Sequence, residues 1–410
     1  MISVVSFNGG RGARNLLPSL VEIEGVSLTS IVNAYDDGKS TGVLRQFFKM
    51  LGPSDIRKVQ ESLLPKSLPE YDNVKRLFDH RYPVPANRDK ILEEIYQFAT
   101  GNTNVIAGVC INDELIKTTL RFYLLTFYKG VNTIEKCEAK KLSLDDCNIM
   151  NLVYAGAFLA AGGNFEQATI NIGKLFKLSG SVLPTNIEDK KLVAIREDGT
   201  ILYSEAEIVE LRSNVRIKKI YLLDEYPDKE ILSHLSIAEV EEYFEAMNRQ
   251  VKITPRVKHS VANADIIIYS SGTQHSSLYP SYITEGLTDA IIANKKALKI
   301  FITNIGEDYE TPRYNANDFI KGAIRYLRMG SQFTVDVSDL INIAFINNRF
   351  SGKLEENYVK YDEAELNSYG FKVIIDALED VENPGKHNGK FLAGKIMELY
   401  NEYFISINSC

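Results

Sequence analysis

Three short segments carry the residue types that could bind and transfer a phosphorylated ligand. Each follows a run of β-branched or apolar residues and combines glycines with hydroxyl, amide or carboxyl side chains. The first segment spans residues 8–13, the second spans 36–42 and the third spans 270–277. In a sheet of parallel strands, the loops at the carboxyl ends of the strands are where ligands bind. The residues best suited to chemistry therefore stand where strands are predicted to end.

The first segment is rich in glycine, with Gly9, Gly10 and Gly12 among four consecutive residues. Because glycine has no Cβ atom, the backbone can approach a ligand closely, and a helix after it offers unpaired N–H groups to a phosphate. We predict that these three glycines contact a phosphorylated ligand. A plain tight turn is the alternative, because G-G-x-G lacks the full spacing of the dinucleotide-binding motif.

The second segment begins with two adjacent carboxylates, Asp36 and Asp37, and continues with a Gly-Lys-Ser run. This run does not complete a phosphate-binding P-loop, since Asn33 occupies the position of the first glycine of that motif. We predict that Asp36 and Asp37 hold Mg²⁺, while Ser40 and nearby backbone N–H groups face a phosphate. A solvated acidic turn is the alternative.

The third segment contains Gly272, Thr273, His275 and Ser276 and is predicted to form a second anion-binding loop. His275 is a candidate for phosphate contact or proton transfer, and a hydrogen-bonded structural histidine is the alternative. Asn304 follows the next predicted strand, so it lies on the same predicted edge.

The elements that must position these segments follow from the pattern of apolar residues. Strands are predicted at 3–7, 28–35, 217–223, 265–269, 298–303 and 371–375, and helices at 14–20, 151–178, 237–247, 282–293 and 316–329. Strands that alternate with helices predict an α/β fold, namely a Rossmann-like, doubly wound and mainly parallel sheet. An Asp198-Gly199 turn predicts a small β-hairpin over 191–208 that adds an antiparallel element to this sheet.

The predicted sheet is discontinuous in sequence. We expect residues 1–60 and 148–380 to form the Rossmann-like nucleotide-binding core. Residues 61–147 have a helical pattern and are predicted to be a helical insertion, and residues 381–410 are predicted to be a C-terminal helical tail.

Composition excludes several function classes. The chain has 410 residues, 45% hydrophobic and 25% charged, which excludes disordered and fibrous proteins. A net charge of −7 lacks the electrostatic footprint of a nucleic-acid partner, and the sequence has no apolar run of the ~18 residues that a membrane span needs. We expect a cytoplasmic protein. Four cysteines without a C-x-x-C pair and five scattered histidines argue against zinc, so any metal is expected to be oxygen-ligated.

Taken together and in this order, the three segments resemble the family that contains 2-phospho-L-lactate transferase and the bacterial gluconeogenesis factor. Further motifs support the resemblance, which spans residues 1–60 and 148–380. They include Asp55-Ile56-Arg57, Asn151-Leu152-Val153, residues 180–184, Asp198-Gly199 with Glu205, Ala264-Asp265, Asn304 and Glu310-Thr311.

The resemblance implies a Rossmann-like nucleotide site with one of two roles. In the transferase branch, a phosphorylated small acid passes from a guanosine-diphosphate donor to a hydroxyl acceptor with Mg²⁺. Our leading hypothesis is such a Mg²⁺-dependent transferase, with Asp36 and Asp37 holding the metal and orienting the acceptor. Asn151 and Thr273 would then hydrogen-bond the donor. Arg45 or Arg57 would balance the charge at the donor. The resemblance implies all of these catalytic roles.

The competing hypothesis is a non-catalytic metabolic regulator that binds a UDP-sugar, as in the gluconeogenesis-factor branch. A third is a member that has lost the family ligand and keeps only the fold.

Arg11 and Lys39 depart from the family pattern and would add positive charge near the phosphates. The expected partner is a nucleotide-diphosphate small molecule, either GDP-linked or a UDP-sugar. A homodimer is compatible with the sequence, because two-fold assemblies are the commonest default.

Overall fold

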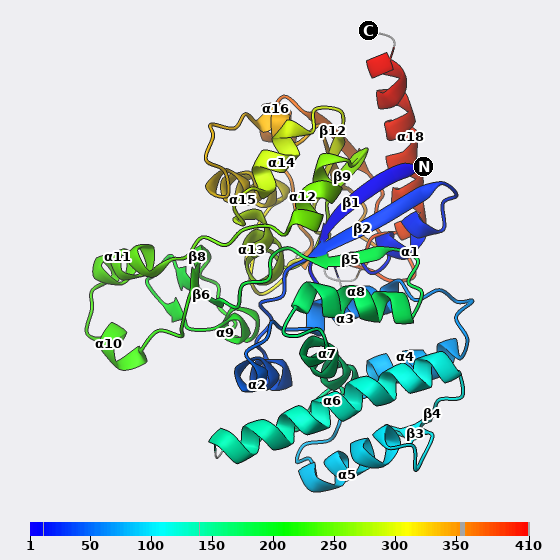
Figure 1. Cartoon of the computed structure of the whole chain (residues 1–410). Coiled ribbons are helices and arrows are strands. Elements are labelled where there is room, and N and C mark those ends of the chain that lie inside the picture. The colour runs from blue at the N-terminus through cyan, green and yellow to red at the C-terminus, as the bar shows by residue number, and fades with distance from the viewer. Residues whose placement is uncertain (11, 139, 353–356, 409–410) are drawn as a thin grey trace.

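A seven-stranded, wholly parallel sheet forms the centre of the molecule (Figure 1). This computed structural model describes residues 1–410 except 11, 139, 353–356 and 409–410. The strands, in spatial order, are β12 (Lys372–Asp376), β11 (Ile343–Asn347), β10 (Leu298–Ile302), β9 (Ile266–Tyr269), β1 (Ile2–Asn8), β2 (Val26–Val32) and β5 (Ser181–Pro184). The predicted α/β fold with a doubly wound parallel sheet is confirmed.

The central strands are mostly apolar and largely buried because helices cover both faces of the sheet. All four residues of β9 are fully buried. Val4 of β1 lies opposite Leu28 of β2 on one side and opposite Ile266 of β9 on the other. Two strands, β5 and β11, were not predicted, although both are buried over most of their length.

The strand order reverses between β1 and β9. From β1 the chain proceeds to β2 and β5 at one edge, and from β9 it proceeds through β10 and β11 to β12 at the other edge. The loops after β1 and β9 therefore diverge at the topological switch point, where α/β sheets bind ligands. Gly9 follows β1, and Ser270 follows β9.

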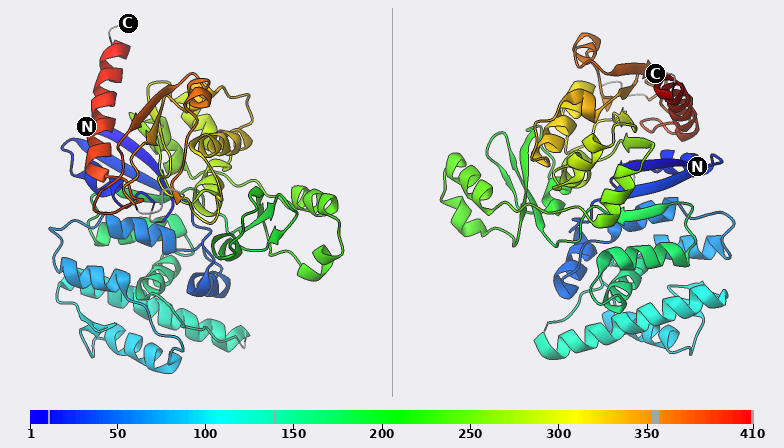
Figure 2. Two further views of the ribbon diagram at one scale, coloured as in Figure 1. Left: turned by 180° about the vertical axis from the view of Figure 1, so that it is seen from behind. Right: turned by 45° about the horizontal axis from the view of Figure 1, so that its top comes forward.

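Helices on both faces complete the layers (Figure 2). They are α1 (Leu16–Val21), α3 (Ser54–Ser62), α8 (Phe165–Leu175), α12 (Pro255–Ala262), α13 (Tyr279–Tyr282), α14 (Leu287–Ala293), α15 (Ala316–Met329), α16 (Val337–Leu340), α17 (Glu363–Asn367) and α18 (Gly389–Asn408), with a π-helical turn η1 (Gln274–Leu278). The predicted helix at 316–329 is confirmed, and a capping box between Asn315 and Asp318 fixes its start.

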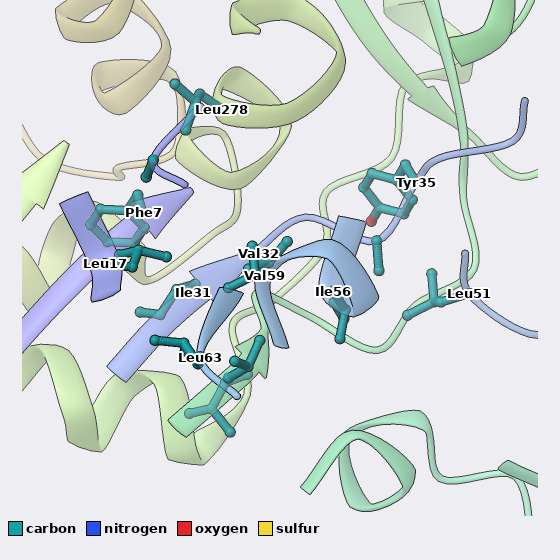
Figure 3. Close-up of a cluster of buried hydrophobic side chains, with 14 of the residues drawn as sticks. Phe7, Leu17, Ile31, Val32, Tyr35, Leu51, Ile56, Val59, Leu63 and Leu278 are labelled. Atoms are coloured by element: carbon teal, nitrogen blue, oxygen red, sulfur yellow. The ribbon is translucent and has the colours of Figure 1, made fainter. Parts of the chain in front are cut away.

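Figure 3 shows the core beneath the first two strands. Phe7 of β1 and Ile31 of β2 point into a cluster with Leu17 of α1, Val59 of α3 and Leu63 directly after α3. Each of these side chains is at most 1% exposed. Close packing of this kind fixes where the loops after β1 and β2 leave the sheet.

Helices also form a block on one side of the sheet (Figure 1). It comprises α2 (Lys39–Phe48), α4 (Tyr71–Asp79), α5 (Arg88–Ala99), α6 (Glu114–Glu138), α7 (Ile149–Ala160) and a two-stranded ribbon of β3 (Val105–Ile106) and β4 (Val109–Cys110). The region predicted as one helix at 151–178 is two helices, α7 and α8, because Gly162 and Gly163 adopt positive φ angles between them. The division into core, insertion and tail stays a prediction.

The predicted hairpin lies in a separate antiparallel sheet of β7 (Ile201–Leu202), β6 (Lys191–Arg196) and β8 (Ile217–Leu223), so it does not extend the main sheet. The hairpin ends at Leu202, and α9 (Glu205–Glu210) follows it. With α10 (Lys229–Ser233) and α11 (Ile237–Met247), this sheet forms a lobe beside the main body (Figure 1). The correction has a physical reason: one face of β6 packs on the main core, and the other face has its own cluster around Phe244.

No helix within the described residues is both long and apolar enough to cross a membrane. Cys147 is buried, whereas Cys110 and Cys137 are exposed. Arg11 and Cys410 lie outside the described residues.

Candidate functional site

A cavity of about 980 Å³ lies at the carboxyl edge of the sheet, over the switch point. The loops after β1, β2, β9 and β10 contribute to its lining, together with residues 383–387. Eight of the predicted site residues line it: Gly9, Gly10, Gly12, Asp36, Gly272, Thr273, Ser276 and Asn304. The structure thus brings together residues from all three predicted segments.

The glycines allow the loop after β1 to touch the loop after β9 and the start of α3. A Cβ atom on Gly12 would stand 2.2 Å from the carbonyl oxygen of Ser271, and one on Gly9 would stand 2.2 Å from the Cβ of Ser277. Gly10 has a φ of +48°, and a Cβ there would stand 2.9 Å from Oδ1 of Asp55. These glycines are therefore required for close backbone packing around the cavity, in addition to any contact with a ligand.

Asn304 holds the third segment in place from the end of β10. Its Oδ1 accepts from the backbone N–H of Gly272 at 2.9 Å, and its Nδ2 donates to the Gly272 carbonyl at 3.0 Å. Thr273 and Ser277 share a hydrogen bond between their hydroxyls at 2.8 Å. Glu310 accepts from the backbone N–H groups of His275 and Ser276, both at 2.9 Å. This loop is therefore preorganised.

Three carboxylates, Asp36, Asp55 and Glu205, line one end of the cavity, which we call the acidic corner. Burial and the charge of Asp55 raise the pKa of Asp36. Burial and the charges of Asp36, Asp37 and Asp55 raise the pKa of Glu205 well above its usual range. Lys58 partly balances this charge, with its Nζ 2.9 Å from Oδ1 of Asp55.

Asp55 and Lys58 were not predicted as site residues, although a helical signal could have found them. They are three residues apart on α3, so their side chains share one face of the helix, whereas Arg57 points elsewhere. The Arg57 guanidinium donates to Oδ1 of Asn151 and to the carbonyl of Phe78. It therefore joins three helical segments instead of facing the cavity.

Asp37 also points away from the cavity. Its Oδ1 accepts from the backbone N–H of Ala206 at 2.8 Å, and its Oδ2 accepts from the hydroxyl of Tyr226 at 2.6 Å. Both carboxylate oxygens are therefore engaged in the junction between the loop after β2 and the start of α9. The structure does not bring Asp36 and Asp37 together as a pair in the cavity.

Three further predicted residues lie outside the described lining of the cavity. Arg45 is 1% exposed and donates to the carbonyl of Tyr35 and to Oδ1 of Asp189, both at 2.7 Å. Ser40 donates to the carbonyl of Asp146 at 3.0 Å. Asn151 is fully buried among the helices, beside Arg57. Each of these side chains forms hydrogen bonds within the protein that hold the segments around the loop after β2 together.

Lys39 and His275 likewise do not belong to the described lining of the cavity. The Lys39 amine lies 3.6 Å from Oδ2 of Asp146. His275 is buried against the rings of Tyr279 and Tyr326, and burial lowers its pKa to about 3. A neutral, enclosed imidazole matches the structural alternative for His275 better than phosphate contact does.

Residues 379–388 form a strap across the cavity that was not predicted, because the whole of 381–410 was expected to be helical. Glu379 and His387 pair as an antiparallel bridge, and the N–H of Asp380 donates to the carbonyl of Lys386 at 2.8 Å. Asn383 and Lys386 line the cavity with His387. A polar loop of this kind carries no periodic signal, so sequence alone does not reveal it.

His387 is the most enclosed of the strap residues that line the cavity. It is 7% exposed, and its Nδ1 lies 3.3 Å from the hydroxyl of Ser271. Its Nε2 has no hydrogen-bond partner among the described residues. Burial lowers its pKa to about 4, against the opposing effect of the Thr303 backbone. A neutral, enclosed imidazole at this position holds the strap against the loop after β9 and forms part of the cavity wall.

The residues predicted to hold Mg²⁺ do not fit that ion as a pair, since both oxygens of Asp37 are engaged elsewhere. Within the described part of the chain, no three His, Cys, Asp or Glu side chains form a group that could hold a metal ion. We therefore derive no chemical step through a metal.

A doubly wound parallel sheet with a preorganised polar cavity at its switch point defines a Rossmann-like α/β protein. The chain belongs to the 2-phospho-L-lactate transferase CofD family, whose family model matches residues 4–379. The strap therefore lies almost wholly beyond the region that defines the family.

Curated relatives of similar length bear another name. The gluconeogenesis factor of Bacillus subtilis is 23% identical over 404 residues, which cover 97% of this chain and 98% of the relative. The putative gluconeogenesis factor of Thermotoga maritima is 24% identical over 337 residues, covering 82% of this chain and 78% of the relative. A crystal structure of a Bacillus halodurans protein shares the fold with a TM-score of 0.66 at 21% identity, covering 97% of this chain and 99% of that one.

Proposed function

We propose that this protein is a regulatory protein that binds a nucleotide-diphosphate sugar, with a UDP-sugar as the ligand class, and that it binds without a metal pair at Asp36 and Asp37. The observation that carries this proposal is the orientation of Asp37, whose two oxygens serve the fold. The names of the curated relatives, which match over most of their length, support a regulatory role.

The chemistry of the cavity lining supports a ligand of this class. Carboxyl groups accept hydrogen bonds and, when protonated, also donate one, so the acidic corner suits the hydroxyl groups of a ribose or a sugar. Arg14 and Lys386 also line the cavity and supply donors for phosphate oxygens. A volume of about 980 Å³ accommodates a ligand of this size.

Calorimetric titration of the purified protein tests the proposal. UDP-glucose, UDP and GDP are each titrated with Mg²⁺ and with EDTA, while chromatography follows consumption of the ligand. We expect saturable binding of UDP-glucose in EDTA, weaker binding of GDP and no turnover. Binding only of GDP, or a strict requirement for Mg²⁺, would contradict the proposal.

His387→Asn provides a matched variant for the same titration. Asparagine retains a polar atom near the position of Nδ1 beside Ser271 but removes the rest of the imidazole ring from the cavity lining. We expect about a tenfold loss of affinity, because the ligand loses packing against the ring. Glu382→Gln, on an exposed part of the strap, is the control and should bind as the wild type does.

A transferase is the second candidate function, and the acidic corner is the observation that favours it. Carboxyl groups with raised pKa values, such as those of Asp36 and Glu205, are suited to accept or donate a proton at an acceptor hydroxyl. The test is an assay with a guanosine-diphosphate-linked phospholactate donor and a deazaflavin acceptor. Release of GMP that is lost in Asp36→Asn would establish this function in place of the regulatory one.

A further inference from the structure

A second cavity, of about 1120 Å³, lies at the β5 edge of the main sheet, away from the candidate site. It is lined by the first half of β2, by β5, by α8 with the turn after it, and by α12. In Figure 1, α8 and α12 lie on opposite sides of β5, so the cavity is a groove along the edge of the sheet between two helical layers. We call it the edge groove.

The edge groove follows the last strand of the main sheet, where Ser27 and Ser181 are exposed and Val182 and Leu183 are buried. β5 is the terminal strand of the sheet, and it pairs only with residues 29–32 of β2. Val26, Ser27 and Leu28 of β2 extend beyond the start of β5 and line the groove. An uncovered strand edge is a template to which an extended segment can add as a further strand.

The charge of the edge groove is one-sided. Lys174, Lys177, Arg256 and His259 line it, and no carboxylate does so among the described residues. Lys174 and Lys177 take part in no ion pair in the described part of the chain, while Arg256 lies 3.4 Å from Glu166 outside the lining. In a chain of net charge −7, a groove with cations alone is a local exception.

This charge distribution selects the occupant. A second copy of the chain, paired edge to edge about a two-fold axis, would bring each lysine toward the same cationic groove of its partner. Like charges so placed repel, and they disfavour that assembly. An extended segment with carboxylate side chains would instead satisfy both the strand edge and the cations.

We propose that the edge groove is a docking site for an acidic, extended peptide segment of a partner protein, which adds to the sheet as a strand beside β2 and β5. Backbone hydrogen bonds to the sheet supply affinity. The cations of α8 and α12 select acidic side chains over basic ones. The proposal is independent of the ligand in the switch-point cavity, since none of the residues that line the edge groove line that cavity.

Fluorescence anisotropy with three labelled octapeptides tests the proposal on the full chain. The probes alternate valine with glutamate, with serine or with lysine, and they are titrated at ~0.15 M salt to limit long-range attraction. We expect the glutamate peptide to bind at least tenfold more tightly than the other two. Equal binding of all three peptides, or no binding of the glutamate peptide, would overturn the proposal.

A matched pair of variants separates the groove from general electrostatics. Lys174→Glu/Lys177→Glu reverses two groove charges, whereas Lys129→Glu/Lys136→Glu makes the same change in net charge on exposed positions of α6. The first variant should lose at least tenfold in affinity for the glutamate peptide, and the second should not. Equal losses in both variants would refute docking in the groove.

Hydrogen exchange then distinguishes strand addition from attraction alone. Bound glutamate peptide should slow amide exchange in residues 26–28 and 181–183, which border the groove. Binding without this protection would contradict strand addition. Sedimentation of the free protein adds one further outcome: a dimer that the Lys174→Glu/Lys177→Glu variant alters would make a second copy the occupant and overturn the peptide assignment.

Discussion

The Asp37 carboxylate links the loop after β2 to the lobe through Ala206 and Tyr226. Hydrogen bonds to a buried charged group contribute about 1.5–3 kcal/mol each. We expect Asp37→Ala to lower the free energy of unfolding by about 3 kcal/mol, because two such bonds are lost. Urea denaturation measures the change, and binding of UDP-glucose to the folded variant should remain.

Asp36→Ala is the matched variant for Asp37→Ala. We expect it to weaken ligand binding and to leave the unfolding free energy nearly unchanged. Asp36 lines the cavity, and the neighbouring charge of Asp55 raises its pKa, so removing it relieves repulsion. Its free energy of unfolding should change by less than about 1 kcal/mol, while ligand affinity should fall. Equal destabilisation by both variants would show that the two carboxylates do not have separate roles.

At the scale of residues, sequence patterns predicted which loops form the site better than which side chains face it. Asp36 and Asp37 were both predicted to hold Mg²⁺, but adjacent side chains in an extended chain point to opposite sides, and only Asp36 lines the cavity. The same reasoning on a helix separates Arg57 from Asp55 and Lys58. Burial of Arg45 and His275 depends on segments far away in the sequence, such as 189–190 and 310–326, and no local pattern reveals it.

At the scale of elements, Gly12 sets the distance between the loops after β1 and β9. Alanine there would place a Cβ atom 2.2 Å from the Ser271 carbonyl oxygen. We expect Gly12→Ala to cost about 1–3 kcal/mol of unfolding free energy through overpacking and to weaken ligand binding. Chemical denaturation and the calorimetric titration measure the two effects.

Gly394→Ala is the control for this prediction. Gly394 lies inside α18, and a Cβ there meets nothing within 4 Å. Alanine has the higher helix propensity, so the variant should be as stable as the wild type or more stable by up to about 1 kcal/mol. A similar loss in both variants would argue against a steric role for Gly12.

Glu310 anchors the π-helical turn η1 at its start and gives the stability of the protein a pH dependence. Burial and the charge of Asp308 raise its pKa from the ordinary 4.5 to about 8. Between these values the folded state binds the proton more tightly than the unfolded state does, so the unfolding free energy falls as pH rises from about 4.5 to 8.

Glu310→Gln tests this dependence. Glutamine can still accept from the N–H groups of His275 and Ser276 and can donate to the Ser276 hydroxyl, but it does not titrate. We expect the unfolding free energy of the variant to vary less with pH than that of the wild type across this window. Parallel curves from urea denaturation at pH 5, 6, 7 and 8 would contradict the assignment to Glu310.

Elements were predicted well where apolar periodicity is strong. The strands β1, β9, β10 and β12 and the helix α15 lie close to their predicted positions. β5 was missed because four residues ending in a proline are too short a pattern, and β8 was assigned to the main sheet because a strand pattern does not indicate which sheet contains it. The sheet that a strand joins depends on the strands with which it pairs, and these lie far away in the sequence.

At the scale of the whole molecule, Arg216 ties the lobe to the main body. Its guanidinium donates to the carbonyl of Arg313 at 2.6 Å and to Oδ2 of Asp318 at 2.9 Å, and it stacks over the ring of Tyr314. Arg216→Ala should lower the unfolding free energy by about 1–2 kcal/mol, because the contacts are partly exposed. Amide exchange in residues 217–223 should become faster.

Lys218→Ala is the matched control in the neighbouring strand β8. Its amine pairs with Glu241 within the lobe, at 2.6 Å and with the lysine about half exposed. Exposed pairs contribute about 0–1 kcal/mol, so exchange and stability should stay near those of the wild type. Faster exchange in both variants would indicate that β8 itself is unstable, independent of its attachment.

The strap has a consequence for protein synthesis. Gly9 to Gly12 are translated long before Lys386 and His387, which line the same cavity. α18 in turn packs on α1, directly after the first glycine loop. A nascent chain therefore has the strands of its sheet before it has a complete cavity, and a small molecule that requires the strap can recognise only chains translated beyond residue 388.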